Sequence, residues 1–171
     1  LFLLEKEMIL YHGSNVEVEI PRIINNQERT NDFGAAFYLT SNKQQAAKFA
    51  KIVFTRKKNI GAPIINHYWI DDDYLEEINI VKYEAPNEEW IDFVTACRAN
   101  REPEMDADIV YAPVADDKVY RVILLYEQGL ISKKEAIKQM LVKSKYNQYA
   151  FKSKEAISHL KFLKAEEVKN D

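Results

Sequence analysis

Apolar residues follow helical spacing in four parts of this chain, and each part has a helix-starting or helix-ending signal beside it. Ser41–Gln44 reads SNKQ, which has the form of a capping box, and apolar residues then recur at helical spacing up to Phe54. The first predicted helix therefore covers residues 42–57. The second is capped by Asn87 and carries Trp90, Phe93, Val94 and Cys97 on one side. The third covers residues 120–128 and ends before Gly129, and the fourth begins at the capping box Ser132–Glu135.

Shorter stretches rich in β-branched and aromatic residues predict strands. They do not alternate regularly with the helices, which argues against a doubly wound parallel sheet. We therefore expect a single α+β domain over residues 8–171, with mostly antiparallel sheets and flanking helices, and we interpret residues 1–7 as a leader or a cloning remnant. The predicted strands are Ile9–His12, Ala36–Thr40, Ile64–Ile70, Ile78–Tyr83, Ile109–Ala112, Tyr146–Phe151 and Lys161–Ala165.

Composition fits a folded domain. The chain has 171 residues, of which 47% are hydrophobic, and that is enough to bury a sizeable core. Cys97 is the single cysteine, so no internal disulfide can form, which suits a reducing compartment. No apolar run reaches the roughly 18–20 residues that a membrane span needs. We expect a cytoplasmic protein without a membrane partner.

Charge is distributed unevenly. Residues 131–171 hold 10 lysines and 5 acidic residues, whereas the first 130 residues hold 14 basic and 22 acidic ones. Four of these lysines, Lys143, Lys145, Lys152 and Lys154, bracket Gln148. Two interpretations are open: a solvated helix face, or a surface that binds a polyanion.

Several chemistries lack their motifs. His12, His67 and His159 lie far apart without metal-ligand spacing, so no metal site is expected. The chain contains neither the glycine pattern of a Rossmann turn nor that of a phosphate-binding P-loop. It also lacks the Gly-x-Ser-x-Gly turn of serine hydrolases.

Three motifs remain: YHGS at Tyr11–Ser14, NDFGAAFYLT at Asn31–Thr40 and YNQYAF at Tyr146–Phe151. In this order they resemble the histidine-tyrosine-glutamate class of ADP-ribosyltransferases, which includes diphtheria toxin and the poly(ADP-ribose) polymerases. The chain is more narrowly similar to a bacterial family of uncharacterised domains that also share WIDFV and a segment like DIVYAPVADD. The resemblance covers most of residues 8–163 and implies the ADP-ribosyltransferase fold, with split, mostly antiparallel sheets.

The resemblance also implies NAD as a substrate and assigns roles to residues. His12 would hydrogen-bond a ribose, and Gly13 would hold the nicotinamide carboxamide through its main chain with help from Ser14. Tyr38 and Phe49 would stack on the two sides of the cationic nicotinamide ring, a contact that gains about 0.5–2 kcal/mol. Each of these residues also has a purely structural interpretation, as a turn, strand or core residue.

Three positions depart from the family pattern. Ala36 and Ala112 stand where relatives carry glycine, which costs on the order of 1 kcal/mol if the backbone needs a positive φ and little if it needs only a small residue. Gln148 stands where the signature glutamate would orient the ribose and supply negative charge. A glutamine keeps the hydrogen bonds and loses the charge, which disfavours polymer synthesis.

A catalytic acid could then come from elsewhere, and Asp32, Asp92, Asp116 and Asp117 are the candidates. Turn or capping roles are the alternative for the last two. Arg29 and the Asn100-Arg101 pair are candidates for binding the NAD pyrophosphate or the acceptor, and an arginine at a helix C-terminus is also what the helix dipole favours.

We expect an NAD-dependent mono-ADP-ribosyltransferase that modifies a protein or a nucleic acid, by analogy a bacterial toxin or phage-defence effector with an antitoxin partner. Three alternatives stay open at this point. They are an NAD glycohydrolase, a catalytically silent module that binds NAD or ADP-ribose, and a pure interaction protein.

Overall fold

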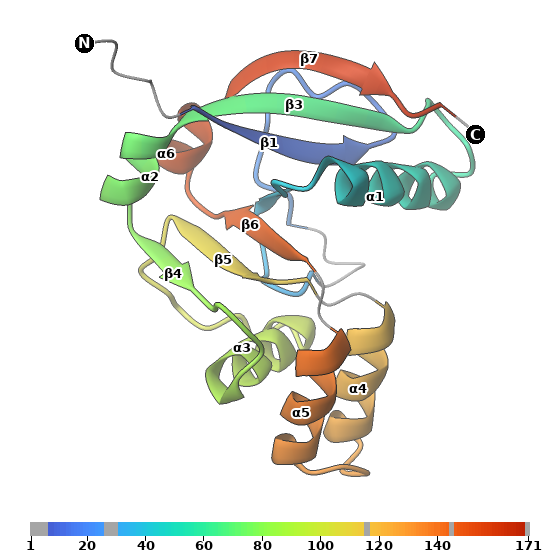
Figure 1. Ribbon diagram of the computed structural model, residues 1–171, viewed down its shortest axis with the longest axis vertical. Coiled ribbons are helices and arrows are strands. Elements are labelled where there is room, and N and C mark those ends of the chain that lie inside the picture. Colours follow the sequence, from blue (N-terminus) through green and yellow to red (C-terminus); the bar gives the residue numbers. More distant parts are fainter. Residues whose placement is uncertain (1–6, 26–30, 115–116, 144–145, 170–171) are drawn as a thin grey trace.

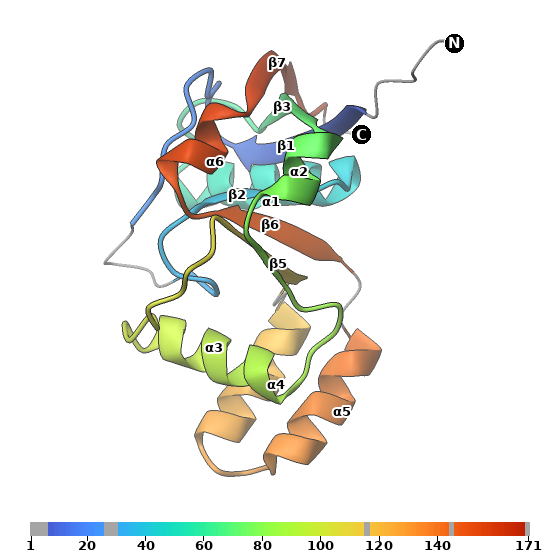
Figure 2. The same cartoon turned by 90° about the vertical axis from the view of Figure 1, so that its left-hand side faces the viewer.

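Two β-sheets lie one above the other in this protein, and helices cover the far side of one of them (Figures 1 and 2). The computed structural model describes residues 7–25, 31–114, 117–143 and 146–169. The architecture is α+β, as the sequence predicts, and its sheets are antiparallel except for one strand pair. In the described ranges no helix is long and apolar enough to cross a membrane.

The first sheet has the strand order β1-β3-β7. It consists of β1 (Glu7–Ser14), β3 (Ile64–Asp71) and β7 (Lys161–Glu167), and both strand pairs are antiparallel. The second sheet has the order β2-β6-β5-β4, with β2 (Phe37–Leu39), β6 (Asn147–Phe151), β5 (Ile109–Pro113) and β4 (Ile80–Lys82). Only β4 and β5 run parallel. All seven predicted strands are confirmed.

Four predicted helices are also confirmed: α1 (Lys43–Arg56), α3 (Glu88–Arg98), α4 (Asp117–Glu127) and α5 (Lys133–Lys143). Asn42 caps α1 through the amide of Gln45, one residue later than the predicted capping box at Ser41–Gln44, and Asn87 caps α3 through the amide of Trp90 as predicted. Two short helices are not predicted from the sequence, α2 (Asp72–Glu77) and α6 (Lys154–Ser158), because six and five residues are too few to show a periodic apolar stripe.

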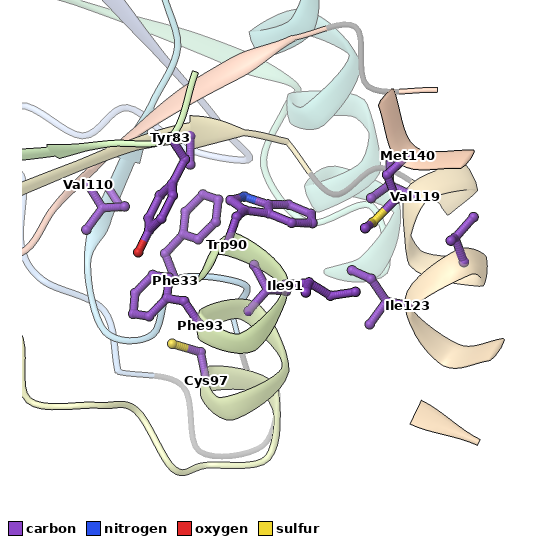
Figure 3. Close-up of a cluster of buried hydrophobic side chains, with 14 of the residues drawn as sticks. Phe33, Tyr83, Trp90, Ile91, Phe93, Cys97, Val110, Val119, Ile123 and Met140 are labelled. Atoms are coloured by element: carbon purple, nitrogen blue, oxygen red, sulfur yellow. The ribbon is translucent and has the colours of Figure 1, made fainter. Parts of the chain in front are cut away.

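The buried side chains form two clusters. One lies between the two sheets and includes Leu10, Phe37, Tyr68 and Phe151. The other lies between the second sheet and helices α3, α4 and α5, and its centre is Trp90, which is fully buried among other aromatic and aliphatic side chains (Figure 3). The sheet that carries Gln148 is therefore covered on both faces.

The alanines that replace family glycines cause no backbone strain. Among the described residues, the only non-glycine residues with positive φ are Lys58, Asn59 and Asn100, so Ala36 and Ala112 have ordinary backbone angles. Both alanines are fully buried in the cluster around Trp90. These positions need a small side chain and not a left-handed backbone, which settles the alternative left open by the sequence.

Candidate functional site

The three sequence motifs meet where the two sheets join. Tyr11 of β1 and Thr40, just after β2, exchange two main-chain hydrogen bonds of 2.8 and 2.9 Å. β2 pairs in turn with β6, with Leu39 opposite Tyr149, so the same register puts Thr40 opposite Gln148. The Thr40 hydroxyl lies 3.3 Å from the main-chain oxygen of Asn147. Residues more than 100 positions apart are thus neighbours at this junction.

Gly13 lies just beyond this junction and is buried. Main-chain groups along a strand point alternately to its two sides, and those of Tyr11 point to Thr40 and away from β3. The N–H and C=O of Gly13, two residues later, therefore point the same way, beyond the last residue pair that joins the two sheets. No hydrogen bond links either group to another described residue. They form a donor and acceptor pair of the kind that binds an amide.

Gly13 also has a structural reason to be glycine. A Cβ on this residue would lie 2.3 Å from the main-chain oxygen of Ala46 and 2.7 Å from the nitrogen of Ala50, both on α1. The helix therefore packs directly on the strand at this point. Both the structural and the ligand-binding interpretations of this glycine are compatible with its position.

His12 is held in one orientation. Its Nδ1 lies 2.7 Å from the main-chain oxygen of Tyr38, and its ring stacks on Phe37 with 4.3 Å between the ring centroids. A carbonyl only accepts, so Nδ1 carries the proton and Nε2 of the neutral ring presents a lone pair. Burial lowers the pKa of His12, although the hydrogen bond to Tyr38 opposes this shift. The imidazole is therefore neutral at pH 7, with Nε2 able to accept a hydrogen bond from a hydroxyl.

Tyr38 is anchored by its hydroxyl. The hydroxyl donates to the main-chain oxygen of Gly34 at 2.6 Å and accepts from the amide of Phe33 at 3.2 Å. Its ring stacks on that of Phe33 at 6.2 Å. Burial raises the pKa of this phenol far above its usual value, so the hydroxyl stays protonated. The ring is partly exposed and fixed in place.

Gln148 lies on the face of the second sheet that Tyr38 also occupies. Side chains alternate along β6, so Gln148 lies on the same side as Ala150, which belongs to the cluster around Trp90. Ala112, the residue opposite Gln148 on β5, belongs to the same cluster. His12 lies on the opposite side, in contact with Phe37. The junction thus brings the main chains of these residues together, whereas their side chains reach it from two sides.

Phe49 and Ser14 flank the junction. Phe49 is 43% exposed, although it stands next to Ala50, which packs against Gly13. Its ring has the Arg56 guanidinium 6.0 Å from its centroid. Phe49 is thus an exposed aromatic side chain on the helix that borders the site. Ser14 is buried, and its hydroxyl accepts a 3.4 Å hydrogen bond from the amide of Val16.

The described candidate acids take part in structural ion pairs. Asp32 pairs with Arg98 of α3 at 3.3 Å, and Asp92 pairs with Lys133 at 2.7 Å, which links α3 to α5. Asp116 and Arg29 lie outside the described residues, and of Asp117 only the main chain, at the start of α4, is described.

Asn100 and Arg101 end a helix. Asn100 has a φ of 54°, and the amide of Arg101 donates to the main-chain oxygen of Ala96. This geometry is that of a C-terminal cap and accounts for the asparagine without a ligand.

The polyanion interpretation of the late lysines is wrong for Lys152. The side chain of Lys152 is only 10% exposed and pairs with Glu102. Lys154 is exposed, whereas Lys145 and the side chain of Lys143 are outside the described part of the chain. Of the four lysines that bracket Gln148, the structure thus describes one exposed side chain, that of Lys154, and one held in an ion pair, that of Lys152.

Asn66 is not among the residues predicted from the sequence, and it is fully buried on β3 opposite His12. Its side chain accepts from the amide of Val18 at 2.8 Å and donates to the oxygen of Val16 at 3.2 Å, so it holds the chain just after Ser14. A polar residue inside the apolar strand around IINHYWI was the signal that could have found it.

Within the described ranges, no group of three or more His, Cys, Asp or Glu residues is placed to hold a metal ion. His67 faces Glu166, with 3.0 Å between Nε2 and a carboxylate oxygen, and burial lowers its pKa.

The structure thus defines an α+β protein with two sheets joined at β1 and β2 and a set of polar and aromatic groups at the joint. The chain belongs to the family described as "Protein of unknown function (DUF3990)", whose model matches residues 8–162. No curated protein and no solved structure matches the chain.

Proposed function

We propose that this protein has the ADP-ribosyltransferase fold and transfers a single ADP-ribose from NAD to a macromolecule. The observation that carries the proposal is the meeting of three motifs at the sheet junction. Tyr11–Thr40 pairing brings the strand of His12 and Gly13 beside the strand of Tyr38, and β6 adds Gln148. The resemblance seen in the sequence assigns the same motifs to an NAD pocket.

The chemistry of the site fits nicotinamide and ribose. The free main-chain N–H and C=O of Gly13 match the acceptor and donor of a carboxamide. The neutral His12 presents Nε2 as an acceptor for a ribose hydroxyl, because Nδ1 is held by Tyr38. Tyr38 and the exposed Phe49 supply aromatic faces for a cationic ring. The carboxamide, the ribose and the nicotinamide ring of NAD thus each have a chemical counterpart among these residues.

The transfer breaks the bond between the ribose C1′ and the nicotinamide nitrogen. The bonding electrons leave with nicotinamide, which becomes neutral, and the ribose passes through an oxocarbenium-like transition state, as in glycoside hydrolysis. A nucleophile of the acceptor then bonds to C1′ and loses a proton. Gln148 would orient a ribose hydroxyl by hydrogen bonding without adding charge, so catalysis depends mainly on positioning.

A silent NAD-binding module is the second candidate, and one observation favours it. Gln148 carries no charge, and Asp32 and Asp92, which were candidates to replace the missing glutamate, are committed to ion pairs with Arg98 and Lys133. Such a module would be stabilised by NAD and would release no nicotinamide.

Two measurements separate the candidates: release of nicotinamide, and transfer of labelled ADP-ribose from isotopically labelled NAD to lysate protein and RNA. We expect the wild type to label one macromolecule class and Gln148→Ala to lose about 10²–10³-fold in rate, which is typical of removing one oriented transition-state contact. Gln128→Ala, a change at an exposed glutamine near the end of α4, is the matched control. Equal turnover by wild type and Gln148→Ala would refute the role of Gln148, and full turnover without any macromolecule would identify a glycohydrolase.

Binding is tested separately from turnover. Millimolar NAD should raise the melting temperature, because a ligand that binds only the native state stabilises it. His12→Ala should abolish this shift. A wild type that shows neither the shift nor nicotinamide release would contradict both candidates and leave an interaction protein.

A further inference from the structure

We propose that Lys152 and Glu102 are positioning residues that clamp the loop Phe33–Ala35 and thereby fix Tyr38 in the pocket. The inference rests on the proposed function, because it assumes that Tyr38 lines an NAD site. Lys152 directly follows β6, the strand of Gln148, so the clamp links the strand of one motif with the loop of another.

Lys152 makes three short contacts. Its Nζ lies 2.7 Å from the main-chain oxygen of Phe33, 3.0 Å from that of Ala35 and 2.5 Å from a carboxylate oxygen of Glu102. An ammonium group has three donors, so each of them has an acceptor. The lysine side chain is 10% exposed, which leaves it no role as a surface charge.

Glu102 holds the same loop from the other side. Its second carboxylate oxygen accepts a 3.0 Å hydrogen bond from the amide of Ala35. Between the two held residues, Gly34 has a φ of 74°, and a Cβ there would lie only 2.0 Å from the Glu102 carboxylate. The glycine therefore provides both the backbone angle and the space that the carboxylate occupies.

The clamped loop in turn holds Tyr38. The Tyr38 hydroxyl donates to the oxygen of Gly34 and accepts from the amide of Phe33, so the ring is tied to the loop by two hydrogen bonds. The main-chain oxygen of Tyr38 then accepts from His12. A loop that moved would thus move the ring of Tyr38 and disturb the group that orients the imidazole.

Lys152→Met tests the clamp, because methionine keeps the length of the side chain and removes its donors. We expect this variant to bind NAD about tenfold more weakly than the wild type and to exchange the amide hydrogens of Phe33 and Ala35 faster. Lys154→Met, a change at an exposed lysine two positions later, is the matched control and should alter neither. If Lys152→Met does not fold, Glu102→Gln carries the test, since it keeps an acceptor for the lysine and gives up the charge.

A double-mutant cycle separates positioning from general stability. In a Tyr38→Ala background, Lys152→Met should cost no further NAD affinity, although it should still lower the melting temperature. Additive losses of affinity, or an NAD affinity of Lys152→Met equal to that of the wild type, would overturn the clamp and leave the proposed function standing. A wild type that does not bind NAD would overturn both.

Discussion

The substitution Gly13→Ala tests the most crowded point of the site. Gly13 has no left-handed φ, so alanine is compatible with its backbone, and only space opposes the change. The added Cβ would meet the main-chain oxygen of Ala46 at 2.3 Å and the main-chain nitrogen of Ala50 at 2.7 Å. These atoms stand four residues apart in α1, where such pairs form the helical hydrogen bonds.

The size of the effect follows from the overlap. Ordinary contact with a Cβ begins at 3.4 Å, so the helix would have to move away by about 1 Å. Both atoms belong to the main chain and cannot rotate aside as a side chain would. Overpacking of this kind costs about 1–3 kcal/mol. For a chain of this length the melting temperature should fall by roughly 2–12 °C.

Thermal unfolding with and without NAD provides the assay. Gly129→Ala is the control, because Gly129 has a φ of 71° and a Cβ there would meet nothing within 4 Å. This control should lose on the order of 1 kcal/mol from backbone strain alone and keep its response to NAD. Gly13→Ala should lose stability and also weaken the response to NAD, since the displaced strand and helix both border the proposed NAD site.

An unchanged melting temperature for Gly13→Ala would refute the close packing of α1 on β1. A stable Gly13→Ala variant with normal NAD binding would also remove Gly13 from the proposed pocket. Destabilisation with an intact NAD response would assign this glycine a packing role only.

Three further predictions concern stability. Burial lowers the pKa of both His12 and His67 below the value near 6.5 of the unfolded chain, so the unfolded state binds more protons at acidic pH. The free energy of unfolding should therefore fall as the pH drops from 7.5 to 5.5. Urea titrations at the two pH values check this, and an unchanged midpoint would contradict it. Ala112→Gly should lose about 1 kcal/mol, because the backbone there is not left-handed, and a gain in stability by calorimetry would show that the position prefers glycine. Arg98→Met leaves Asp32 without its partner on α3 and should lower the urea midpoint, by about 1–3 kcal/mol in free energy; an unchanged midpoint would show that the pair contributes nothing.

Local signals explain the success of the predicted elements. Asn42, Asn87 and Ser132 each accept a hydrogen bond from the amide three residues later, and this chemistry depends only on neighbours in the sequence. Strand composition is equally local. The short helix α6 has a cap of the same kind in Ser153, but its apolar pattern is too brief to be recognised.

The sequence by itself also grouped His12, Gly13, Tyr38 and Gln148 as one candidate site, through motif order and resemblance. It could not provide the register that puts Thr40 beside both Tyr11 and Gln148, because strand pairing depends on contacts between residues far apart in the chain. The backbone angles at the two alanines were likewise open until the fold was known.

Only the tertiary structure shows which charged side chains are solvated and which are held in ion pairs. A lysine in the sequence looks the same whether it is solvated or buried, and the sequence left open whether Lys152 belongs to a solvated face or to a surface that binds a polyanion. In the fold it is enclosed by the oxygens of Phe33, Ala35 and Glu102, and Asp32 is paired with Arg98. Burying a charge is costly unless partners satisfy it, and those partners lie 50 or more residues away in the chain, so only the folded structure could reveal them.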